Sequence, residues 1–284
     1  MSRRRDLERH RNSLTEIGDI MNSMKTLAYM ETRKLSRFLD AQHAVVRNIE
    51  TAAADFLSFY PQPLPADGTG MQAYILLGAQ RGFCGDFNHS ILNQLDAALR
   101  QEAAADKPVL IAIGHRLCTL LGQDTRIAAR IDNASVVEEV PYVLGRIVHE
   151  LSSLQNDAHV LDVYGLYHSG EGAVAMRKIL PSFHGDPQQT QRHAYPPLLN
   201  EAPQQFLARL TDNYLFAVLH EMLYTSLMAE NQQRVKHLDG AVKRLEDKSE
   251  KLARRCNALR QEEIIEEIEV ILLSAASLGA GDMT

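Results

Sequence analysis

The residues best suited to chemistry gather around one cysteine. Cys84 lies in the sequence Arg-Gly-Phe-Cys-Gly-Asp-Phe-Asn (residues 81–88), between an apolar segment and a segment with helical spacing. A thiolate is favoured near a helix N-terminus and beside an arginine such as Arg81, which would suit a nucleophile. The nearest histidine, His89, falls just inside the following helix and is not placed to serve the thiol. We therefore interpret Cys84 as a small residue packed in a tight strand-to-helix turn.

The same turn is where a nucleotide-binding fingerprint would lie. Gly78, Gly82 and Gly85 follow a strand-like segment and precede a helix, but their spacing does not make the pattern G-x-G-x-x-G. The sequence also has no phosphate loop of the form G-x-x-x-x-G-K-S/T. Nucleotide binding at this turn is therefore the less favoured alternative.

Two short segments begin like the zinc-protease helix H-E-x-x-H. They start at His149 and His220, but Ser153 and Tyr224 stand where the second histidine is required. A helix without two imidazoles one turn apart does not hold a catalytic zinc ion. We predict that the chain has no catalytic, cofactor-binding or metal-binding residues.

Composition narrows the class of protein. The chain has 284 residues and a formal net charge of −6, so no excess of cations is available for a nucleic-acid partner. Its three cysteines, Cys84, Cys118 and Cys256, are far apart, which favours a reducing compartment over a disulfide framework. The apolar stretch 270–281 is too short to cross a bilayer, and the first residues do not form a signal peptide. We expect a soluble protein that can dock on a membrane complex.

The elements that position these residues begin with a long helix. From Leu14 to Phe56, mostly apolar residues alternate at spacings of three and four, which is the heptad pattern of a helix with a narrow buried seam. Pro61, Pro63 and Pro65 end the helix, because proline cannot continue it. At about 1.5 Å per residue the helix would be about 80 Å long. The seam consists of Leu14, Ile17, Met21, Met24, Ala28, Glu31, Leu35, Phe38, Gln42, Val45, Ile49, Ala52 and Phe56.

A second long helix closes the chain. Pro203 is suited to its first turn, and a broad apolar face follows as far as Leu223. The face then narrows to a seam with the same alternation, and the whole helix would be on the order of 100 Å long. The narrow seam consists of Val235, Leu238, Val242, Leu245, Ser249, Leu252, Cys256 and Leu259.

Each long helix leaves its seam exposed unless another helix covers it. We predict that residues 1–60 and 203–284 pair antiparallel as a coiled-coil shaft, because the chain returns to the first helix after the middle segment. In this pairing we expect Met24 near the stretch 256–264. A homodimeric coiled coil is the alternative.

The middle of the chain, residues 70–200, has a different pattern of apolar residues. Short apolar runs alternate with helical segments, which favours a small parallel or mostly parallel sheet covered by helices. We therefore predict a Rossmann-like α/β domain inserted between the shaft helices, so that the fold class is α/β with a long antiparallel coiled coil. The expected strands are 71–78, 109–114 and 159–167, the expected helices are 88–105, 115–121 and 141–154, and 184–197 is an expected loop.

Charged residues form blocks on the last helix. Basic residues occur from Lys243 to Arg255, and acidic residues from Glu262 to Glu269. Such a face is usually solvated, yet a shaft enclosed by a ring of partners would also carry charges for oriented contact. Periodicity alone does not choose between these interpretations.

Three segments resemble the gamma subunit of F-type ATP synthases. The turn is similar to that family's motif R-G-L-C-G-G-L-N, and the matching residues are Arg81, Gly82, Cys84, Gly85 and Asn88. The segments occur in the family's order over nearly the whole chain. The N-terminal match is carried by Ser13, Leu14, Ile20, Ser23, Met24, Ala28, Arg33 and Lys34, and the C-terminal match by Glu230, Asn231, Asn257, Arg260, Gln261, Ile264, Glu267, Ile268, Ala275 and Ala276.

The resemblance implies a non-catalytic rotor shaft. In that family the helix pair turns inside a hexamer of nucleotide-binding alpha and beta subunits, and couples their chemistry to ion flow through a membrane ring of c subunits. An epsilon-type subunit is a further implied partner, the implied location is the cytoplasmic face of the bacterial inner membrane, and no cofactor is implied. Met24, Arg260, Gln261 and Ile264 match positions that contact the catalytic subunits.

The chain also departs from the family pattern. Asp19-Ile20-Met21 stands where the family usually has Lys-Ile-Thr, Ile265 replaces a threonine, and Asp86 replaces a glycine. These departures favour a divergent branch, such as the alternative sodium-linked bacterial type. Two other classes of function stay open: a structural coiled-coil scaffold unrelated to ATPases, and an enzyme that depends on Cys84.

Overall fold

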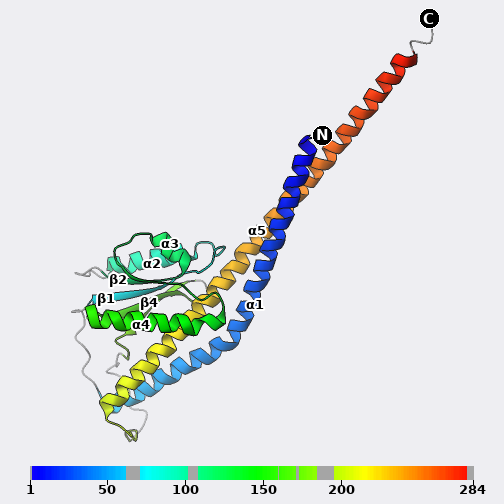
Figure 1. Cartoon of the computed structure of the whole chain (residues 1–284). Coiled ribbons are helices and arrows are strands. Elements are labelled where there is room, and N and C mark those ends of the chain that lie inside the picture. Colours follow the sequence, from blue (N-terminus) through cyan, green and yellow to red (C-terminus); the bar gives the residue numbers. More distant parts are fainter. Residues whose placement is uncertain are drawn as a thin grey trace. The chain divides into compact units, whose positions relative to one another are not determined.

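The computed structural model describes residues 2–61, 71–101, 108–158, 160–170, 173–183 and 195–279. Two very long helices, α1 (Ser2–Phe59) and α5 (Pro203–Gly279), stand at the ends of the chain, with strands and shorter helices between them in sequence (Figure 1). The chain divides into two units, residues 28–235 and a smaller unit of residues 1–27 with 236–284. The predicted mixed α/β class is confirmed by these elements.

The described residues of the larger unit include a five-stranded sheet with the order β3-β2-β1-β4-β5. Strand β1 pairs parallel with β2 and β4, β2 pairs parallel with β3, and β4 pairs antiparallel with β5. The predicted mostly parallel sheet is therefore confirmed. The strands are β1 (Met71–Leu77), β2 (Val109–Ile113), β3 (Ile127–Ile131), β4 (Val160–His168) and β5 (Val174–Leu180).

Strands β3 and β5 were not predicted from the sequence. They lie at the two edges of the sheet, and they carry Arg130, Arg177 and Lys178 in place of a continuous apolar run. Edge strands often carry such charges, which weaken the sequence signal of a strand. The shorter helices are α2 (Phe87–Gln101), α3 (His115–Leu121), the 3-10 turn η1 (Val137–Glu139) and α4 (Val140–Ala158). Residues 102–105 of the expected second helix and 184–194 of the expected loop lie outside the described residues.

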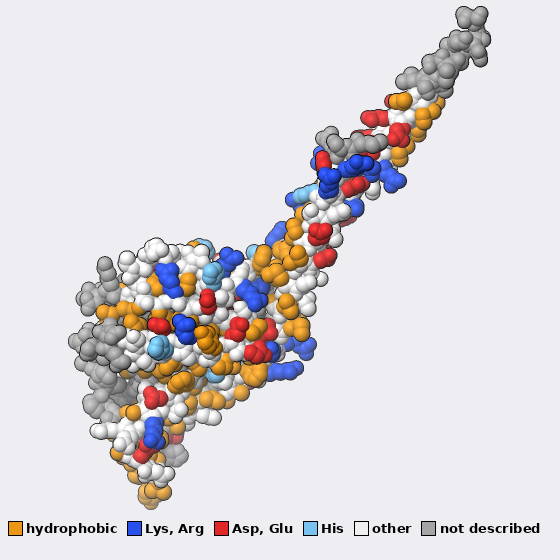
Figure 2. Space-filling model, in the orientation of Figure 1, with side chains coloured by type: hydrophobic (Ala, Val, Ile, Leu, Met, Phe, Trp, Pro, Cys, Tyr) orange, Lys and Arg blue, Asp and Glu red, His pale blue; other side chains and the backbone are white. Residues whose placement is uncertain are grey.

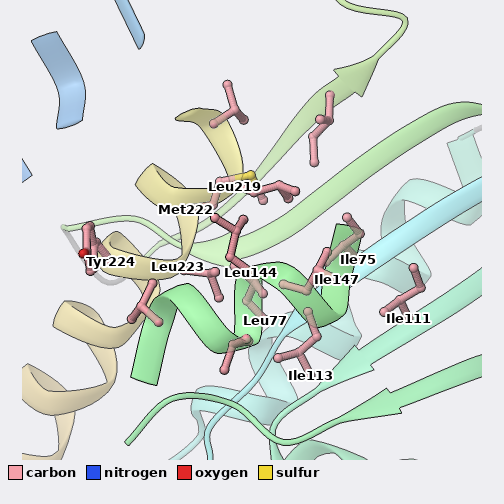
Figure 3. Packing of buried hydrophobic residues seen from close by; sticks show 14 of the residues in the cluster. Ile75, Leu77, Ile111, Ile113, Leu144, Ile147, Leu219, Met222, Leu223 and Tyr224 are labelled. Carbon is pink, nitrogen blue, oxygen red and sulfur yellow. The ribbon is translucent and has the colours of Figure 1, made fainter. Parts of the chain in front are cut away.

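The two faces of the sheet have separate apolar cores. On one face, side chains of β1 and β2 pack against α4 and α5, and Figure 3 shows Ile75, Leu77, Leu144, Ile147 and Met222 among them. On the other face, α2 and α3 cover the alternate residues of the same strands, including Tyr74 and Leu76. Figure 1 shows the sheet lying between α4 and the pair α2 and α3.

A glycine allows α5 to approach the sheet closely. A Cβ at Gly165 of β4 would lie 2.0 Å from the Cε atom of Met222. Met222 is fully buried, so the missing side chain at Gly165 provides its space in the core.

Within each unit, α1 contacts α5 in opposite chain directions. In the larger unit the rings of Phe56 and Phe206 lie 4.9 Å apart, and those of Phe38 and Tyr224 lie 6.2 Å apart. Ion pairs join the two helices in the smaller unit: Lys25 Nζ lies 3.2 Å from Asp239, and Arg4 Nε lies 3.0 Å from Glu263. In each unit, the contact with the higher residue number on α1 has the lower residue number on α5, so the two helices are antiparallel there.

The expected position of Met24 is wrong. Its neighbour Lys25 pairs with Asp239, whereas Glu263 pairs with Arg4 at the start of α1. The stretch 256–264 is therefore about 25 Å or more further along α5 from the partner of Lys25, at about 1.5 Å per residue. A heptad pattern looks the same after a shift of seven residues, so the two seams alone did not set the register.

The predicted seam of α1 is also only partly buried. Of its early positions Leu14 is buried and Ile17 is exposed, and near the end of the helix the buried stripe moves by one residue, so that Val46 and Ala53 are buried in place of Val45 and Ala52. A straight helix has 3.6 residues per turn, so a strict spacing of three and four drifts around its surface. The predicted positions that are buried are Leu14, Ala28, Leu35 and Phe56, whereas Ile17, Phe38 and Val45 are 46%, 44% and 44% exposed.

Candidate functional site

The turn between β1 and α2, residues 78–88, lies at the carboxyl end of the central strand. Its backbone passes through the left-handed region at Phe83 and Gly85, with φ of 64° and 62°. Glycine adopts this conformation freely, whereas the phenylalanine is strained there and is also 46% exposed. The reversal brings Phe87 into the core, where α2 begins.

Side-chain oxygens of the turn accept backbone amides at the end of the sheet. Asn88 Oδ1 accepts the Ala79 N–H at 2.9 Å. Gln80 Oε1 accepts two amides, from His115 at 2.9 Å and from Asn133 at 2.8 Å. These bonds tie the ends of β1, β2 and β3 together. The bond to Asn88 also occupies one amide of the turn itself, that of Ala79, which a nucleotide-binding turn would offer to phosphate.

Three polar residues of α5 hold the turn from the other side. Glu230, Asn231 and Arg234 are only 2%, 2% and 5% exposed. The Glu230 carboxylate accepts the N–H groups of Gln80 and Arg81, each at 3.4 Å. Arg234 donates from Nε to the Gly82 carbonyl at 3.2 Å and from Nη1 to Asn231 Oδ1 at 2.7 Å, and it also bonds directly to Glu230. We call Glu230, Asn231 and Arg234 the α5 polar cluster.

Burial and pairing act in opposite directions on the pKa of Glu230 in the α5 polar cluster. Burial raises the pKa of Glu230, because a carboxylate loses its hydration inside the protein. The Arg234 guanidinium and the two turn amides act in the opposite direction by favouring the charged form. A buried carboxylate needs both a cation and N–H donors to stay charged. Arg234 is the cation, and the turn supplies the N–H donors.

The thiol of Cys84 is buried in the same turn. Its Sγ atom lies 3.6 Å from the Arg81 carbonyl oxygen, and the side chain is 5% exposed. Burial raises the pKa of Cys84 to about 11, and the nearby Glu230 carboxylate adds to the shift. The thiol form is therefore the stable one at neutral pH, which opposes a role as nucleophile.

We expect Cys84 to react slowly with iodoacetamide in the folded chain. A pKa of about 11 instead of 9.0 leaves about a hundredfold less thiolate at pH 8, before any steric protection. Because the folded pKa is the higher one, its contribution to stability is present below pH 9 and is lost as the pH rises from about 9 to 11. The measurement is mass spectrometry of time-resolved labelling at pH 8, with the urea-unfolded chain as control. Equal labelling rates in the two states would contradict this assignment.

A second polar network joins α1, β5 and α5 in the larger unit. Arg177 of β5 donates to Glu221 of α5 at 2.7 Å and to Glu50 of α1 at 2.7 Å. The Tyr214 hydroxyl lies 3.4 Å from the same Glu50 carboxylate, and His43 lies 3.4 Å from Glu221. This network binds both long helices to the edge of the sheet.

The other predicted site residues lie in the smaller unit. Met24 is half-buried on α1, and Arg260 and Gln261 are exposed on α5. Ile264 begins a stretch of exposed apolar side chains that alternate with glutamates, and Figure 2 shows orange and red side chains together there. The exposed apolar residues are Ile264, Ile265, Ile268, Val270, Ile271 and Leu272, at 46% to 65% exposure.

The role of the α5 polar cluster was not predicted from the sequence. Glu230 and Asn231 entered only through the family resemblance, and Arg234 did not enter at all. The sequence offered a partial signal, because this Glu and Arg, four residues apart, follow the broad apolar face of the last helix.

The described residues carry no sign of a metal centre or a membrane span. No three His, Cys, Asp or Glu side chains among them gather closely enough to hold a metal ion. Within the same residues, every helix is too short or too polar to cross a bilayer.

Comparison with known proteins covers nearly the whole chain. The family model described as ATP synthase matches residues 3–278. An ATP synthase gamma chain from Clostridium beijerinckii is 26% identical over 288 residues, covering 96% of this chain and 97% of its own length. The ATP synthase gamma chain of Clostridium botulinum strain Langeland is 23% identical over 274 residues, covering 94% of this chain and 95% of its own. A chain in the structure of Euglena gracilis mitochondrial ATP synthase, OSCP/F1/c-ring, has a TM-score of 0.66 at 16% identity and covers 100% of this chain and 97% of that one.

Proposed function

The chain belongs to the ATP synthase family as a gamma chain, and we propose that it turns as the central shaft of the rotary enzyme. It is a non-catalytic subunit of that complex. Its partners are the alpha and beta subunits of the catalytic hexamer and the membrane ring of c subunits. We propose an epsilon-type subunit as a further partner. Coupling then requires torque to pass along this chain between the ring and the hexamer.

The observation that carries the proposal is the consistent direction of the contacts between α1 and α5. In the larger unit Phe56 contacts Phe206 and Phe38 contacts Tyr224, and in the smaller unit Lys25 pairs with Asp239 and Arg4 with Glu263. We propose that residues 1–60 and 203–284 form an antiparallel coiled-coil shaft that carries the α/β domain of residues 70–200. A rod that transmits torque needs length, a dry seam and directional cross-links. The ion pair of Lys25 with Asp239 is one such cross-link.

We further propose that the end of α5 is the part that meets the catalytic subunits. Ile264 and the exposed apolar residues after it would be poorly solvated unless a partner enclosed them. Arg260 and Gln261 precede them on the exposed surface of α5, and Met24 lies half-buried on α1. These four residues remain our proposed contact positions.

Membership of this family also supports a proposal about where the complex lies. We propose the cytoplasmic face of the bacterial inner membrane as the location, with the chain bound at the periphery of the membrane. Asp19, Asp86 and Ile265 support the proposal that it belongs to a divergent, sodium-linked branch.

We expect the purified chain to hydrolyse no ATP alone, and to enter a hexamer of alpha and beta subunits as a single copy. An asymmetric helix pair cannot fill the central hole of a three-fold ring more than once. Its ordering cost on binding is small, because the pair is already formed. Hydrolysis by the ring should rise or become cooperative when the chain is added. Native mass spectrometry and an ATPase assay on reconstituted subunits measure both results.

Two outcomes of that experiment would overturn the shaft proposal. One is hydrolysis by the isolated chain, and the other is a ring that assembles with several copies of it. A hexamer reconstituted without the chain is the control for the ATPase rate.

A further inference from the structure

The α5 polar cluster is an unusual way to join a helix to a domain. Around it, α5 meets the sheet through apolar side chains such as Leu223 and Leu227, which are 2% and 1% exposed. Apolar packing is non-directional, so by itself it resists rotation or sliding of the helix only through side-chain shape. Glu230 and Arg234 add bonds of fixed direction at the same interface.

Stability alone does not account for these charges. Burying an ion pair removes the hydration of both charges, and replacing such a pair by apolar residues is often neutral or stabilising. The bonds from Glu230 and Arg234 end on backbone atoms: the amides of Gln80 and Arg81 and the carbonyl of Gly82. Backbone atoms cannot change rotamer, and here they are held by the sheet through Gln80 and Asn88. The cluster therefore attaches α5 to a rigid point.

We propose that Glu230 and Arg234 are positioning residues that lock α5 against rotation and sliding relative to the α/β domain, so that torque passes between them without slip. This inference rests on the proposed function as a rotor shaft. Arg234 bonds to Gly82, Asn231 and Glu230, and Glu230 bonds to the two turn amides, so the lock has contacts on both sides of the helix–turn interface. Without it, the apolar face of α5 would still pack on the sheet, but with less resistance to twisting.

The Glu230 carboxylate also occupies the position in which the turn could bind another anion. Two successive amides, those of Gln80 and Arg81, point at one anionic group, as they would at a phosphate in a nucleotide-binding turn. In this chain the anion is a side chain of α5. The turn therefore binds the shaft helix α5 where a nucleotide-binding turn would bind phosphate.

The test uses the complete ATP synthase reconstituted in vesicles with Glu230→Gln or Arg234→Met. Both variants remove the charge pairing and keep a side chain of similar size. We expect ATP hydrolysis to stay near the parent rate while the ions pumped per ATP hydrolysed fall below half of the parent value. Arg234→Lys keeps the cation and should recover part of the coupling.

The control is a second Glu–Arg pair on the same helix with the same spacing. Glu250 and Arg254 lie 2.5 Å apart, but their side chains are 64% and 76% exposed. An exposed pair contributes little, so Glu250→Gln should leave coupling at the parent value.

Amide hydrogen exchange of the full chain tests the lock directly. In Glu230→Ala, the amides of Gln80 and Arg81 lose their acceptor, and we expect their exchange to rise at least about tenfold. Amides of β1 such as that of Ile75 should keep their protection if the domain stays folded. This comparison separates loss of the lock from loss of the fold.

The outcomes are distinct. Unchanged exchange at Gln80 and Arg81, or full coupling in Glu230→Gln, would overturn the lock. A variant complex that is assembled and loses hydrolysis together with pumping would also overturn it, because slip predicts that hydrolysis survives. If the parent chain itself fails to couple hydrolysis to pumping, the shaft proposal fails, and the exchange result still stands by itself.

Discussion

Replacing Leu252 by proline should abolish ATP-driven ion pumping by the reconstituted complex. Leu252 is a half-buried seam position in the interior of α5, a helix of 77 residues. Proline has no N–H to donate to the carbonyl of Lys248, and its ring collides with that carbonyl, at a cost of about 3 kcal/mol. The helix kinks, so the shaft can neither turn on one axis nor keep its seam closed. Pumping is measured by ion uptake into vesicles, alongside assembly by native mass spectrometry.

The matched control is Leu252→Ala, which removes the side chain and keeps the helical N–H. A half-buried leucine costs less than a core leucine when truncated, and we expect the alanine variant to keep most of the pumping. Cys84→Ser should also pump, because the buried thiol provides packing and no chemistry. If Leu252→Pro pumps normally, α5 does not transmit torque through this segment. If Cys84→Ser assembles and fails to pump, the packing role of Cys84 is wrong.

Replacing Gly78 by alanine should destabilise the α/β domain by about 3 kcal/mol, the upper end of the usual cost of overpacking a core. A Cβ at this position would lie 2.3 Å from Leu117 Cβ and 2.9 Å from Asn88 Oδ1. Leu117 is fully buried, and a Cβ atom cannot move without its backbone. The neighbouring Gly114 has φ of 109°, and its own Cβ would lie 2.5 Å from the Gly78 carbonyl oxygen, so neither backbone can yield. Urea unfolding of the full chain measures the loss.

Gly145→Ala provides the control with the opposite sign. Gly145 is exposed in α4, and outside its own helix backbone no described atom lies within 4 Å of where a Cβ would stand. Alanine has the higher helix propensity, so this variant should gain up to about 1 kcal/mol. Equal effects of the two substitutions would mean that a close contact between a Cβ at position 78 and Leu117 does not lower the free energy of unfolding.

Hydrophobic periodicity determined the helices and the central strands of this protein. All eight predicted seam positions from Val235 to Leu259 are buried or half-buried, because over this shorter span the 3-4 spacing drifts little around the helix. Strands β1 and β2 were predicted because a parallel strand in the middle of a sheet is covered on both faces and reads as a continuous apolar run. The edge strands β3 and β5 are covered on fewer sides, so their sequences include arginine and lysine and carry no such run.

The sequence by itself therefore determined which residues form each long helix, where the α/β segment is inserted and which family the motifs resemble. Only the tertiary structure decided the register of α1 against α5, since a heptad pattern is unchanged by a shift of seven residues and the ion pairs of Arg4 and Lys25 select one alignment. It also decided the role of Glu230 and Arg234. In sequence they are a Glu and an Arg four residues apart on a long helix, like Glu250 and Arg254, and only the apolar face before Glu230 distinguishes the two pairs. The difference is burial: one pair faces the turn at the end of the sheet, where water is excluded and backbone groups replace it as partners.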